Sequence, residues 1–554
     1  MRVSLRHCMV LLLTWLLAGN AVQAREQLTI GITQFPSTLH PSIDSMLAKT
    51  YVLGMTRRPF TAYDHDWELT CMLCTELPSF ENGGAVREPT PNGGEGLAVS
   101  YRIRPDARWG DGTPVTTADV AFAWQVGRHP DSRVTNRELF RRILDVEIHD
   151  THHFTLHVDR ITFDYASIGD LRPLPAHIER ETFEYDPSSY HLHSSYVTEP
   201  DNPALYYGPY RISAVERGAQ IILEPNPQWW GEPPGFRRIV IRTIANTAAL
   251  EANLLAGDVD MIAGELGLPL DQALALEQRH GDDYRFLYQP SLIYEHMDVM
   301  LDNPILADRR VRRALLHGAD REAISRQLFA GKQPVAHSSV NPLDSAYTED
   351  IPHYPYDAAR AAELLEAAGW DRIRQGIRHN ATGEPLRLTL MTTAGNRSRE
   401  LVQQVLQSQW RQLGIDVRIE NQPPRVFFGD TVDRRAFDGL AMFAWVSAPE
   451  NVPRSVLHSE EIPAEANNWQ GQNYSGYRNP AMDRLLDTLE TELDPDRRKT
   501  LWAELQRLYA EDLPALPLYF RSDAHVLPPW LEGLRPTGHM NPSSLWVEAW
   551  RALE

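Results

Sequence analysis

The stretch Tyr101-Arg-Ile-Arg-Pro-Asp-Ala-Arg-Trp-Gly-Asp-Gly-Thr-Pro-Val-Thr-Thr-Ala-Asp-Val-Ala-Phe-Ala-Trp124 combines a strand, a turn and a capped helix. Apolar side chains at Val99, Tyr101 and Ile103 alternate with polar ones, which is the period of a half-buried strand. Asp111-Gly112 favours a tight turn after it. This part of the chain therefore predicts a strand that leaves the sheet through a short turn.

The second part of the stretch predicts a helix. Thr116-Thr117-Ala118-Asp119 fits a capping box, in which side-chain oxygens accept from the free amides of the first helical turn. Val120 and Trp124 lie four residues apart on this helix and are expected to face the core. The stretch contains no nucleophile, metal cluster or phosphate loop, so it predicts scaffold rather than chemistry.

The same stretch resembles a signature of the family 5 extracytoplasmic solute-binding proteins, which serve ABC importers for peptides and related solutes. Arg108-Trp109, Asp111–Pro114 and Ala118–Val120 match that signature residue by residue. Further landmarks of the family follow in order along the chain. They are Tyr207–Ile212, Leu223–Trp230, Ala248–Asp260, Met300–Arg321, Asn473–Asp483 and Asp512–Tyr519. The resemblance runs from about residue 27 to the C-terminus.

This resemblance implies an α/β, periplasmic-binding-protein-like fold with a bilobal cleft and three domains. Residues 25–69, 205–291 and 524–554 would form a discontinuous lobe I. Residues 70–204 would form lobe II, and residues 292–523 lobe III. Two crossing connections between lobes I and III would make the hinge.

The clearest local pattern predicts a strand–helix–strand unit. Apolar residues alternate over 386–390 and again over 415–419. Between them, apolar residues recur at helical spacing from Val402 to Leu413, and Gly414 ends the helix. A unit of this size predicts parallel pairing of its two strands.

An arginine-rich segment, residues 309–313, would be compatible with a site for polyanions. Val311 and Leu315, however, form an apolar pair one helical turn apart, with Asp308 before the segment and Gly318 after it. The pattern favours an ordinary helix whose arginines lie in solvent.

The N-terminus predicts a secretory signal peptide over residues 1–24. An apolar core over Met9–Leu17 follows two arginines, and Ala21–Ala24 provides a small-x-small exit. That core is shorter than a membrane-spanning helix. Asn20 stands where a bacterial lipoprotein carries its cysteine. We therefore expect cleavage after Ala24 and a periplasmic protein without a lipid anchor.

Length and charge limit the partners. A chain of 554 residues exceeds what one core usually serves and predicts two or three lobes. A formal net charge of −20 argues against nucleic acid or an anionic membrane as the main partner. The resemblance implies a monomer whose partners are an oligopeptide or peptide-like solute and an ABC permease in the inner membrane.

Two cysteines remain once the signal peptide is removed, Cys71 and Cys74. In the cytosol this spacing would indicate a redox or half-zinc site, but no second Cys or His pair stands at zinc spacing. In an oxidising compartment the spacing predicts a small local disulfide. Its short loop gives little entropic stabilisation.

Catalytic motifs are missing from the sequence. It contains neither the Gly-x-Ser-x-Gly elbow of an α/β hydrolase nor the His-Glu-x-x-His of a zinc protease. We therefore expect a binding protein, with no enzymatic activity, no catalytic residue, no metal site and no cofactor. An exported hydrolase is the alternative from another class.

The segment Gly439–Pro453 is the candidate ligand-binding region. In the peptide-binding branch of the family, a strand here ends in an aromatic residue, and an Asp three residues later pairs with the free amine of the peptide. This chain has Trp445, but the third position is Ala448, which leaves Glu450 as the candidate carboxylate. The resemblance implies Trp445, Ser447 and Glu450 as ligand-binding residues. Core packing of Trp445 and a solvated Glu450 are the alternatives.

Four further residues are expected in the cleft from their positions alone. Gln34 and Phe35 follow the first strand of lobe I, and Tyr294 and His296 lie on the strand that leads into lobe III. Core packing or exposure is the alternative for each. Together these features predict that hinge closure captures the solute. Within the same fold, a nickel chelate, a haem-like solute or an oligosaccharide is the alternative ligand.

Overall fold

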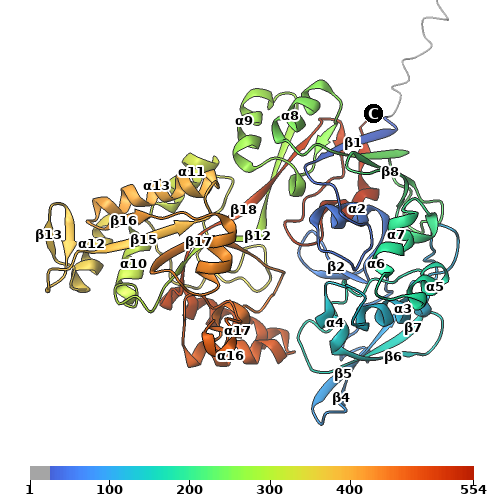
Figure 1. The fold of residues 1–554 in the computed structure, drawn as a ribbon, viewed down its shortest axis with the longest axis horizontal. Helices are drawn as coiled ribbons and strands as arrows, with labels where there is room; N and C mark the ends of the chain where they lie inside the picture. The colour runs from blue at the N-terminus through green and yellow to red at the C-terminus, as the bar shows by residue number, and fades with distance from the viewer. Residues whose placement is uncertain (1–24, 554) are drawn as a thin grey trace, which may run out of the picture.

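The computed structural model describes residues 25–553, so the predicted signal peptide lies outside the described residues. Figure 1 shows two halves, with two long strands running between them. These strands are β12 (Arg285–Val299) and β18 (Ala515–Leu527), which pair antiparallel. Residues 25–284 and residues 528–553 after β18 form one half, and residues 300–514 form the other.

A ten-stranded sheet extends through both halves in the order β16-β15-β17-β12-β18-β11-β1-β10-β9-β8. Its outer strands in one half are β16 (Asp416–Ile419), β15 (Arg387–Thr392) and β17 (Gly439–Val446). In the other half they are β11 (Met261–Ile262), β1 (Gln27–Ile32), β10 (Arg238–Thr243), β9 (Gln220–Pro225) and β8 (Tyr210–Glu216). Both halves are therefore built on one continuous sheet.

The link between the halves is irregular at one point. The pairing of β12 with β18 shifts register between Pro290 and Tyr294, so regular pairing stops between the halves and then resumes. At this break the Leu292 amide donates to the Gly538 carbonyl, 2.9 Å away, and the Leu292 carbonyl accepts from the Ser447 amide at 3.3 Å. The predicted lobe boundaries at 291/292 and 523/524 fall inside these two strands. Because bulges bend a strand locally, this break is the natural position for a hinge.

A separate four-stranded sheet has the order β4-β5-β7-β6. Its strands are β4 (Ala85–Pro89), β5 (Glu95–Arg102), β7 (His153–Val158) and β6 (Ile143–Ile148). Two-stranded pairs complete the strands: β2 (Thr61–Tyr63) with β3 (Leu69–Cys71), β13 (Arg372–Arg374) with β14 (Ile377–His379), and β19 (Leu531–Glu532) with β20 (Arg551–Ala552).

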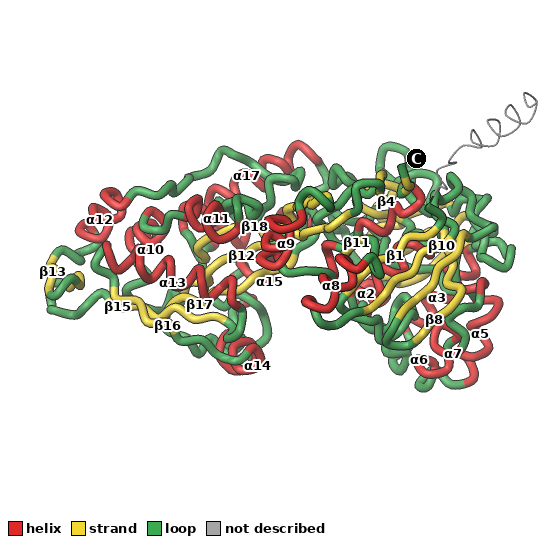
Figure 2. Tube along the Cα trace, turned by 90° about the horizontal axis from the view of Figure 1, so that it is seen from above, coloured by secondary structure: helices red, strands yellow, loops and turns green. Residues whose placement is uncertain are grey.

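The helices cover these sheets, and Figure 2 shows them along the elongated molecule. In the first half they are α2 (Leu47–Thr56), α3 (Thr117–Arg128), α4 (Arg137–Arg142), α5 (Ala176–Tyr185), α6 (Tyr190–His193), α7 (Ser195–Thr198), α8 (Thr247–Ala256) and α9 (Leu270–His280). In the second half they are α10 (Arg309–His317), α11 (Arg321–Phe329), α12 (Ala358–Ala367), α13 (Arg397–Gln412), α14 (Pro424–Val426), α15 (Arg454–Leu457), α16 (Pro480–Thr491) and α17 (Pro495–Asp512). Within residues 25–553, no helix is both long and apolar enough to span a bilayer.

The strand, turn and helix predicted for residues 101–124 are confirmed as the end of β5, a turn and α3. The Asp119 carboxylate accepts from the Thr116 amide at 2.9 Å, from the Ala176 amide at 2.9 Å and from the Trp109 indole at 3.2 Å. Val120 is fully buried, as predicted, whereas Trp124 is half-buried and its indole donates to the Ile143 carbonyl. Asp119 therefore hydrogen-bonds the start of α3 to the segments around Trp109 and Ala176. These contacts support the scaffold role predicted for the stretch.

The main core of the first half is a hydrophobic cluster that includes residues from both predicted lobes I and II, and a smaller cluster lies around α8 and α9. Ile30 and Ile241 of the large sheet belong to it, together with Trp109 and Phe154 around the small sheet. The second half has its own main cluster, around Leu388, Leu406 and Trp410 of the predicted strand–helix–strand unit. That unit is confirmed, because β15 pairs parallel with β16 across α13.

The arginines of α10 correct one expectation. Asp308 caps the helix start, as predicted, but Arg312 is only 4 % exposed and does not lie in solvent. Its guanidinium donates to the carbonyls of Leu306, Ala307 and Asp512. The prediction of a fully solvated face was wrong because carbonyls at the end of α17 and before α10 bind this side chain.

Cys71 and Cys74 are joined in the structure, with their Cα atoms 5.2 Å apart. We expect neither thiol of the exported protein to react with iodoacetamide before reduction, and both to react after treatment with dithiothreitol. Peptide mass spectrometry measures this. Alkylation of both cysteines without reductant would contradict the prediction of a disulfide.

Candidate functional site

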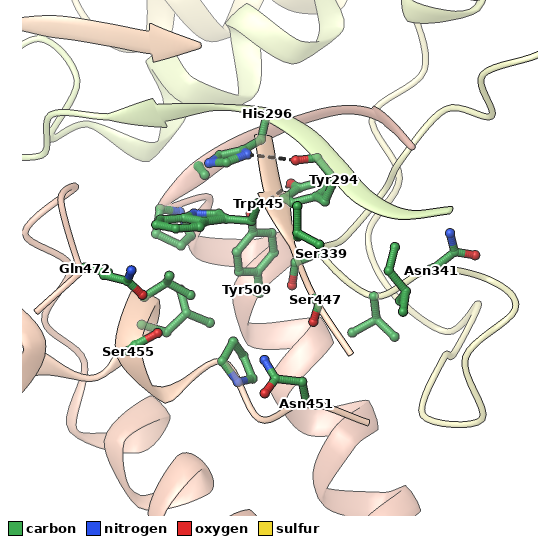
Figure 3. Close-up of a pocket in the computed structure, with 18 of the residues that line it drawn as sticks. Tyr294, His296, Ser339, Asn341, Trp445, Ser447, Asn451, Ser455, Gln472 and Tyr509 are labelled. Atoms are coloured by element: carbon green, nitrogen blue, oxygen red, sulfur yellow. Dashed lines mark hydrogen bonds between the residues drawn. The ribbon is translucent and has the colours of Figure 1, made fainter. Parts of the chain in front are cut away.

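A cavity of about 140 Å³ lies in the second half, where β12, the end of β17 and the start of β18 meet. The loop at residues 339–344 closes it on one side, and residues 451–457, which include α15, close it on another. Figure 3 shows aromatic side chains from β12 and β17 on one wall, and polar side chains from the loops around it. Leu292, which lies at the register break between β12 and β18, is one of the residues that line the cavity.

Strand register explains how the sequence builds the main wall. Side chains two residues apart on a strand share a face, and Tyr294, His296 and Asp298 of β12 all line the cavity. Antiparallel pairing places Trp445 of β17 opposite Tyr294, and Phe443 opposite His296. The predicted residues Tyr294, His296 and Trp445 therefore come together on one wall.

The rings on this wall are nearly parallel. Tyr294 and His296 stack with centroids 4.9 Å apart and an interplanar angle of 6°. His296 and Trp445 are 6.5 Å apart at 15°, and Trp445 and Tyr474 are 5.9 Å apart at 19°. Phe443 packs edge-on against both His296 and Trp445. Tyr294, His296 and Phe443 are buried in this arrangement, and Trp445 is the half-buried ring that the wall offers to a solute.

The polar lining carries negative charge. Asp298 and Asp344 are the acidic residues of the cavity, and none of the described residues that line it is Lys or Arg. Asp344 accepts from the Ala346 and Glu450 amides, both at 2.9 Å, and burial raises its pKa above the ordinary value. Uncharged polar groups of residues such as Ser447 and Asn451 complete the lining.

The tyrosines near the cavity are neutral hydrogen-bonding groups. The hydroxyls of Tyr294 and Tyr509 lie 3.0 Å apart, and the Tyr474 hydroxyl donates to Asp433 at 2.8 Å. Burial raises the pKa of all three tyrosines, and the charge of Asp298 raises each further. They therefore add hydroxyls without adding charge.

Glu450 does not line the cavity, although its neighbours Ala448 and Asn451 do. Its carboxylate accepts from the Ser345 hydroxyl and lies 3.7 Å from Arg498. The residue has a positive φ of 54°, which turns the chain after β17. A contact between Glu450 and the solute stays a prediction.

Gln34 and Phe35 lie in the first half, away from this cavity. Gln34 is exposed, and Phe35 is half-buried against the core of that half. Of the seven predicted ligand residues, the cavity brings four together. These are Tyr294, His296, Trp445 and Ser447.

Asp298, Asp344 and Tyr509 line the cavity and were missed by the sequence analysis. Asp298 carries a usable signal, since it continues the alternation of Tyr294 and His296 along the strand. Asp344 and Tyr509 come from a loop and from α17, and only the folded chain brings them to β12. Local pattern could not have identified these two.

A second cavity of about 560 Å³ lies in the first half, between segments of predicted lobes I and II. Its lining includes four arginines, at positions 57, 58, 142 and 172, together with Tyr63. Burial raises the pKa of Tyr63, and so do the nearby charges of Glu450 and Asp344 from the other half. Tyr63 of this second cavity is therefore close to Glu450 and Asp344 of the other half.

The halves also touch away from the hinge. The Phe163 amide donates to the Glu490 carbonyl at 3.1 Å, and the Arg498 guanidinium lies 3.9 Å from the centre of the Phe163 ring.

Residues 25–553 contain no group of three or more His, Cys, Asp or Glu placed to hold a metal ion.

Two halves joined by a pair of strands, with an aromatic cavity beside the junction, define a hinged solute-binding protein. The family model for bacterial extracellular solute-binding proteins, family 5, matches residues 93–461. The chain belongs to this family, and its fold is the bilobal α/β fold of periplasmic binding proteins.

Known relatives agree with this assignment. The oligopeptide-binding protein AppA of Bacillus subtilis is 25% identical over 79% of this chain and 78% of its own. An oligopeptide-binding protein of Thermus thermophilus, solved with a pentapeptide, is 29% identical, with a TM-score of 0.66 over 95% of this chain and 96% of its own. NikZ of Campylobacter jejuni, solved with Ni(L-His), is 21% identical, with a TM-score of 0.69 over 95% of this chain and 99% of its own.

Proposed function

We propose that this protein is the solute-binding component of an ABC importer, and that it captures oligopeptides or peptide-like solutes and delivers them to the permease. The main support is the position of the aromatic cavity on β12, a strand that also joins the two halves. Two of the relatives named above are oligopeptide-binding proteins, which favours this ligand class over others.

Closure of the halves is the proposed mechanism. A solute that contacts the cavity in one half and the arginine-lined cavity in the other stabilises the closed form more than the open one. The backbone of Leu292 is hydrogen-bonded to Gly538 of the first half and to Ser447, which lines the cavity. A rotation of the two halves about Leu292 therefore moves the wall of the cavity directly. No covalent step is needed.

The mode of amine recognition differs from the pattern of the peptide-binding branch. Ala448 offers no carboxylate, and the Glu450 carboxylate is held by Ser345 and lies near Arg498. Asp298 and Asp344 nevertheless line the cavity, where their carboxylates are available to a cationic group. The carboxylates of this site therefore come from other elements of the fold.

Several finer properties belong to the same proposal. The protein is extracytoplasmic as a member of its family, and we place it in the periplasm, released from its signal peptide after Ala24 and free of lipid. It acts as a monomer together with an inner-membrane permease, and it does not transform its solute.

A thermal-shift experiment tests the proposed function. We expect the mature protein to melt at a higher temperature with a pool of short peptides, because saturation at about 100 times the Kd stabilises the bound form by about 2.7 kcal/mol. Mass spectrometry of the same mixture should recover every peptide intact. Peptide cleavage would support a hydrolase instead, and a shift with nickel–histidine but with no peptide would support a metal-chelate ligand.

A further inference from the structure

Two hydrogen-bond acceptors face one another on the cavity wall. His296 Nδ1 lies 3.3 Å from the Tyr294 carbonyl oxygen, and because a carbonyl only accepts, this contact is a hydrogen bond in the tautomer that carries the proton on Nδ1. In the neutral ring Nε2 is then an acceptor, and it lies 3.2 Å from Asp298 Oδ1, a second acceptor. Within residues 25–553 no hydrogen-bond donor reaches Nε2, although the ring is 1 % exposed. An N–H donor from outside would satisfy both atoms.

A second buried group on this cavity also lacks a partner. Trp502 is 3 % exposed, and its indole N–H has no acceptor among the described residues. Buried polar groups are nearly always hydrogen-bonded, so unpaired ones mark positions where a ligand or ordered water binds. The cavity thus offers acceptors at His296 and Asp298 and a donor at Trp502.

The two charged residues of the lining that are not histidine are both acidic. Asp298 and Asp344 both line the cavity, no described lining residue is Lys or Arg, and both carboxylates are mostly buried. A carboxylate on the solute would meet these two charges without compensation, which is costly in a partly desolvated site. A neutral alkyl group would leave the facing acceptors unpaired.

Size and shape narrow the occupant further. A cavity of about 140 Å³ is close to the roughly 150 Å³ that accommodates benzene in an engineered apolar cavity. It has room for one side chain, and not for a whole peptide. Tyr294 and His296 are buried, and the half-buried Trp445 is the ring of this wall against which a planar or cationic group can pack.

We propose that this cavity selects solutes with a cationic group, a protonated amine or a guanidinium, which binds between His296 Nε2 and Asp298 and packs on the aromatic wall. This inference rests on the proposed function, because it specifies the charge of the peptide side chain that the cavity receives. Such groups supply several N–H donors at once. Charge-assisted hydrogen bonds of this kind are among the stronger ones in proteins.

Matched peptides test the inference. In one series lysine replaces each position of tetra-alanine in turn, and in the other norleucine does, which keeps the chain length but removes the charge. We expect one lysine peptide to bind at least about tenfold more tightly than its norleucine partner in titration calorimetry. Asp298→Asn should remove that difference, and an unchanged circular dichroism spectrum and melting temperature without peptide should show that the variant is folded.

Asp302→Asn is the matched control. Asp302 lies just past the end of β12 and pairs with Arg435, outside the cavity. Its replacement removes the same charge and should leave the lysine preference intact. If Asp302→Asn reduces the preference as much as Asp298→Asn does, the effect is long-range and the assigned position is wrong.

The remaining outcomes separate this inference from the proposed function. If both series bind equally well, the cavity does not select a cationic side chain, and the inference is overturned while peptide binding stands. If no peptide binds, the proposed function fails, and the cavity is then tested with benzamidine against its neutral analogue benzamide. Preferential binding of benzamidine, lost in Asp298→Asn, supports a cationic site, and equal binding overturns it.

Discussion

Trp445→Ala is expected to weaken the binding of an oligopeptide by about 30-fold to 1,000-fold. Buried aromatic anchors at the centre of an interface typically contribute about 2–4 kcal/mol when truncated. Trp445 occupies such a position, since it stacks between His296 and Tyr474 and has Phe443 against its edge. Removing the indole also opens space that water would fill. Titration calorimetry with the tightest-binding peptide measures the change.

Trp445→Phe is the control for this variant. It retains a flat ring between its neighbours and should keep most of the affinity. The melting temperature of each variant without peptide reports whether the fold survives. An unchanged affinity in a well-folded Trp445→Ala protein would show that the solute binds elsewhere.

Glu295→Gln is expected to destabilise the second half by about 3 kcal/mol, which would appear as a lower urea midpoint. Removing one partner of a buried ion pair typically costs about 3–5 kcal/mol, because the opposite charge stays buried and uncompensated. The Glu295 carboxylate is fully buried and binds Arg399 at 2.5 Å and Arg521 at 2.6 Å. Arg521 is 34% exposed, which places the cost at the lower end of that range.

The pH dependence of this difference has a definite sign. Burial alone would raise the pKa of Glu295, but Arg521 and Arg399 outweigh it and hold the pKa below its ordinary value of 4.5. A lowered pKa in the folded state stabilises the protein above the ordinary pKa, and this contribution is lost as the pH falls through the folded value. We therefore expect the difference in unfolding free energy between wild type and Glu295→Gln to be full at about pH 6 and to narrow as the pH falls below the ordinary pKa of 4.5.

Glu363→Gln is the matched control for the ion pair. Glu363 pairs with Arg360 on the surface of α12, where both side chains are more than half exposed. Exposed pairs contribute about 0–1 kcal/mol, so this variant should leave the urea midpoint nearly unchanged. Equal losses in the two variants would mean that burial does not decide the strength of these pairs.

The fold was predictable where local pattern determines structure. The alternation over residues 386–390, the helical spacing up to Leu413 and the capping sequence at Thr116–Asp119 each carry their own structure, and all were confirmed. Arg312 shows the limit of such patterns. Its burial depends on carbonyls at the end of α17, some 200 residues away, and no window of sequence around it contains that information.

The site was predictable in part, for the same reason. Tyr294, His296 and Trp445 were found because strand positions carry over from the family to this chain. Asp344 and the unpaired Trp502 were not, since a loop and a helix bring them to the cavity only when the chain is folded. Glu450 was favoured as the replacement carboxylate because it is near Ala448 in sequence, whereas Asp298 is the carboxylate that the wall of β12 presents.

The position of β18 has a consequence for the order of folding. This strand pairs with β11 in the first half and with β12 in both, so residues 515–527 complete the sheet on both sides. Pairing residues 285–298 with residues 515–527 closes a loop of more than two hundred residues, whose entropic cost must be met before the contacts form. Neither half can therefore complete its sheet before residues 515–527 have been made, and a protein truncated before residue 515 lacks this strand in both halves.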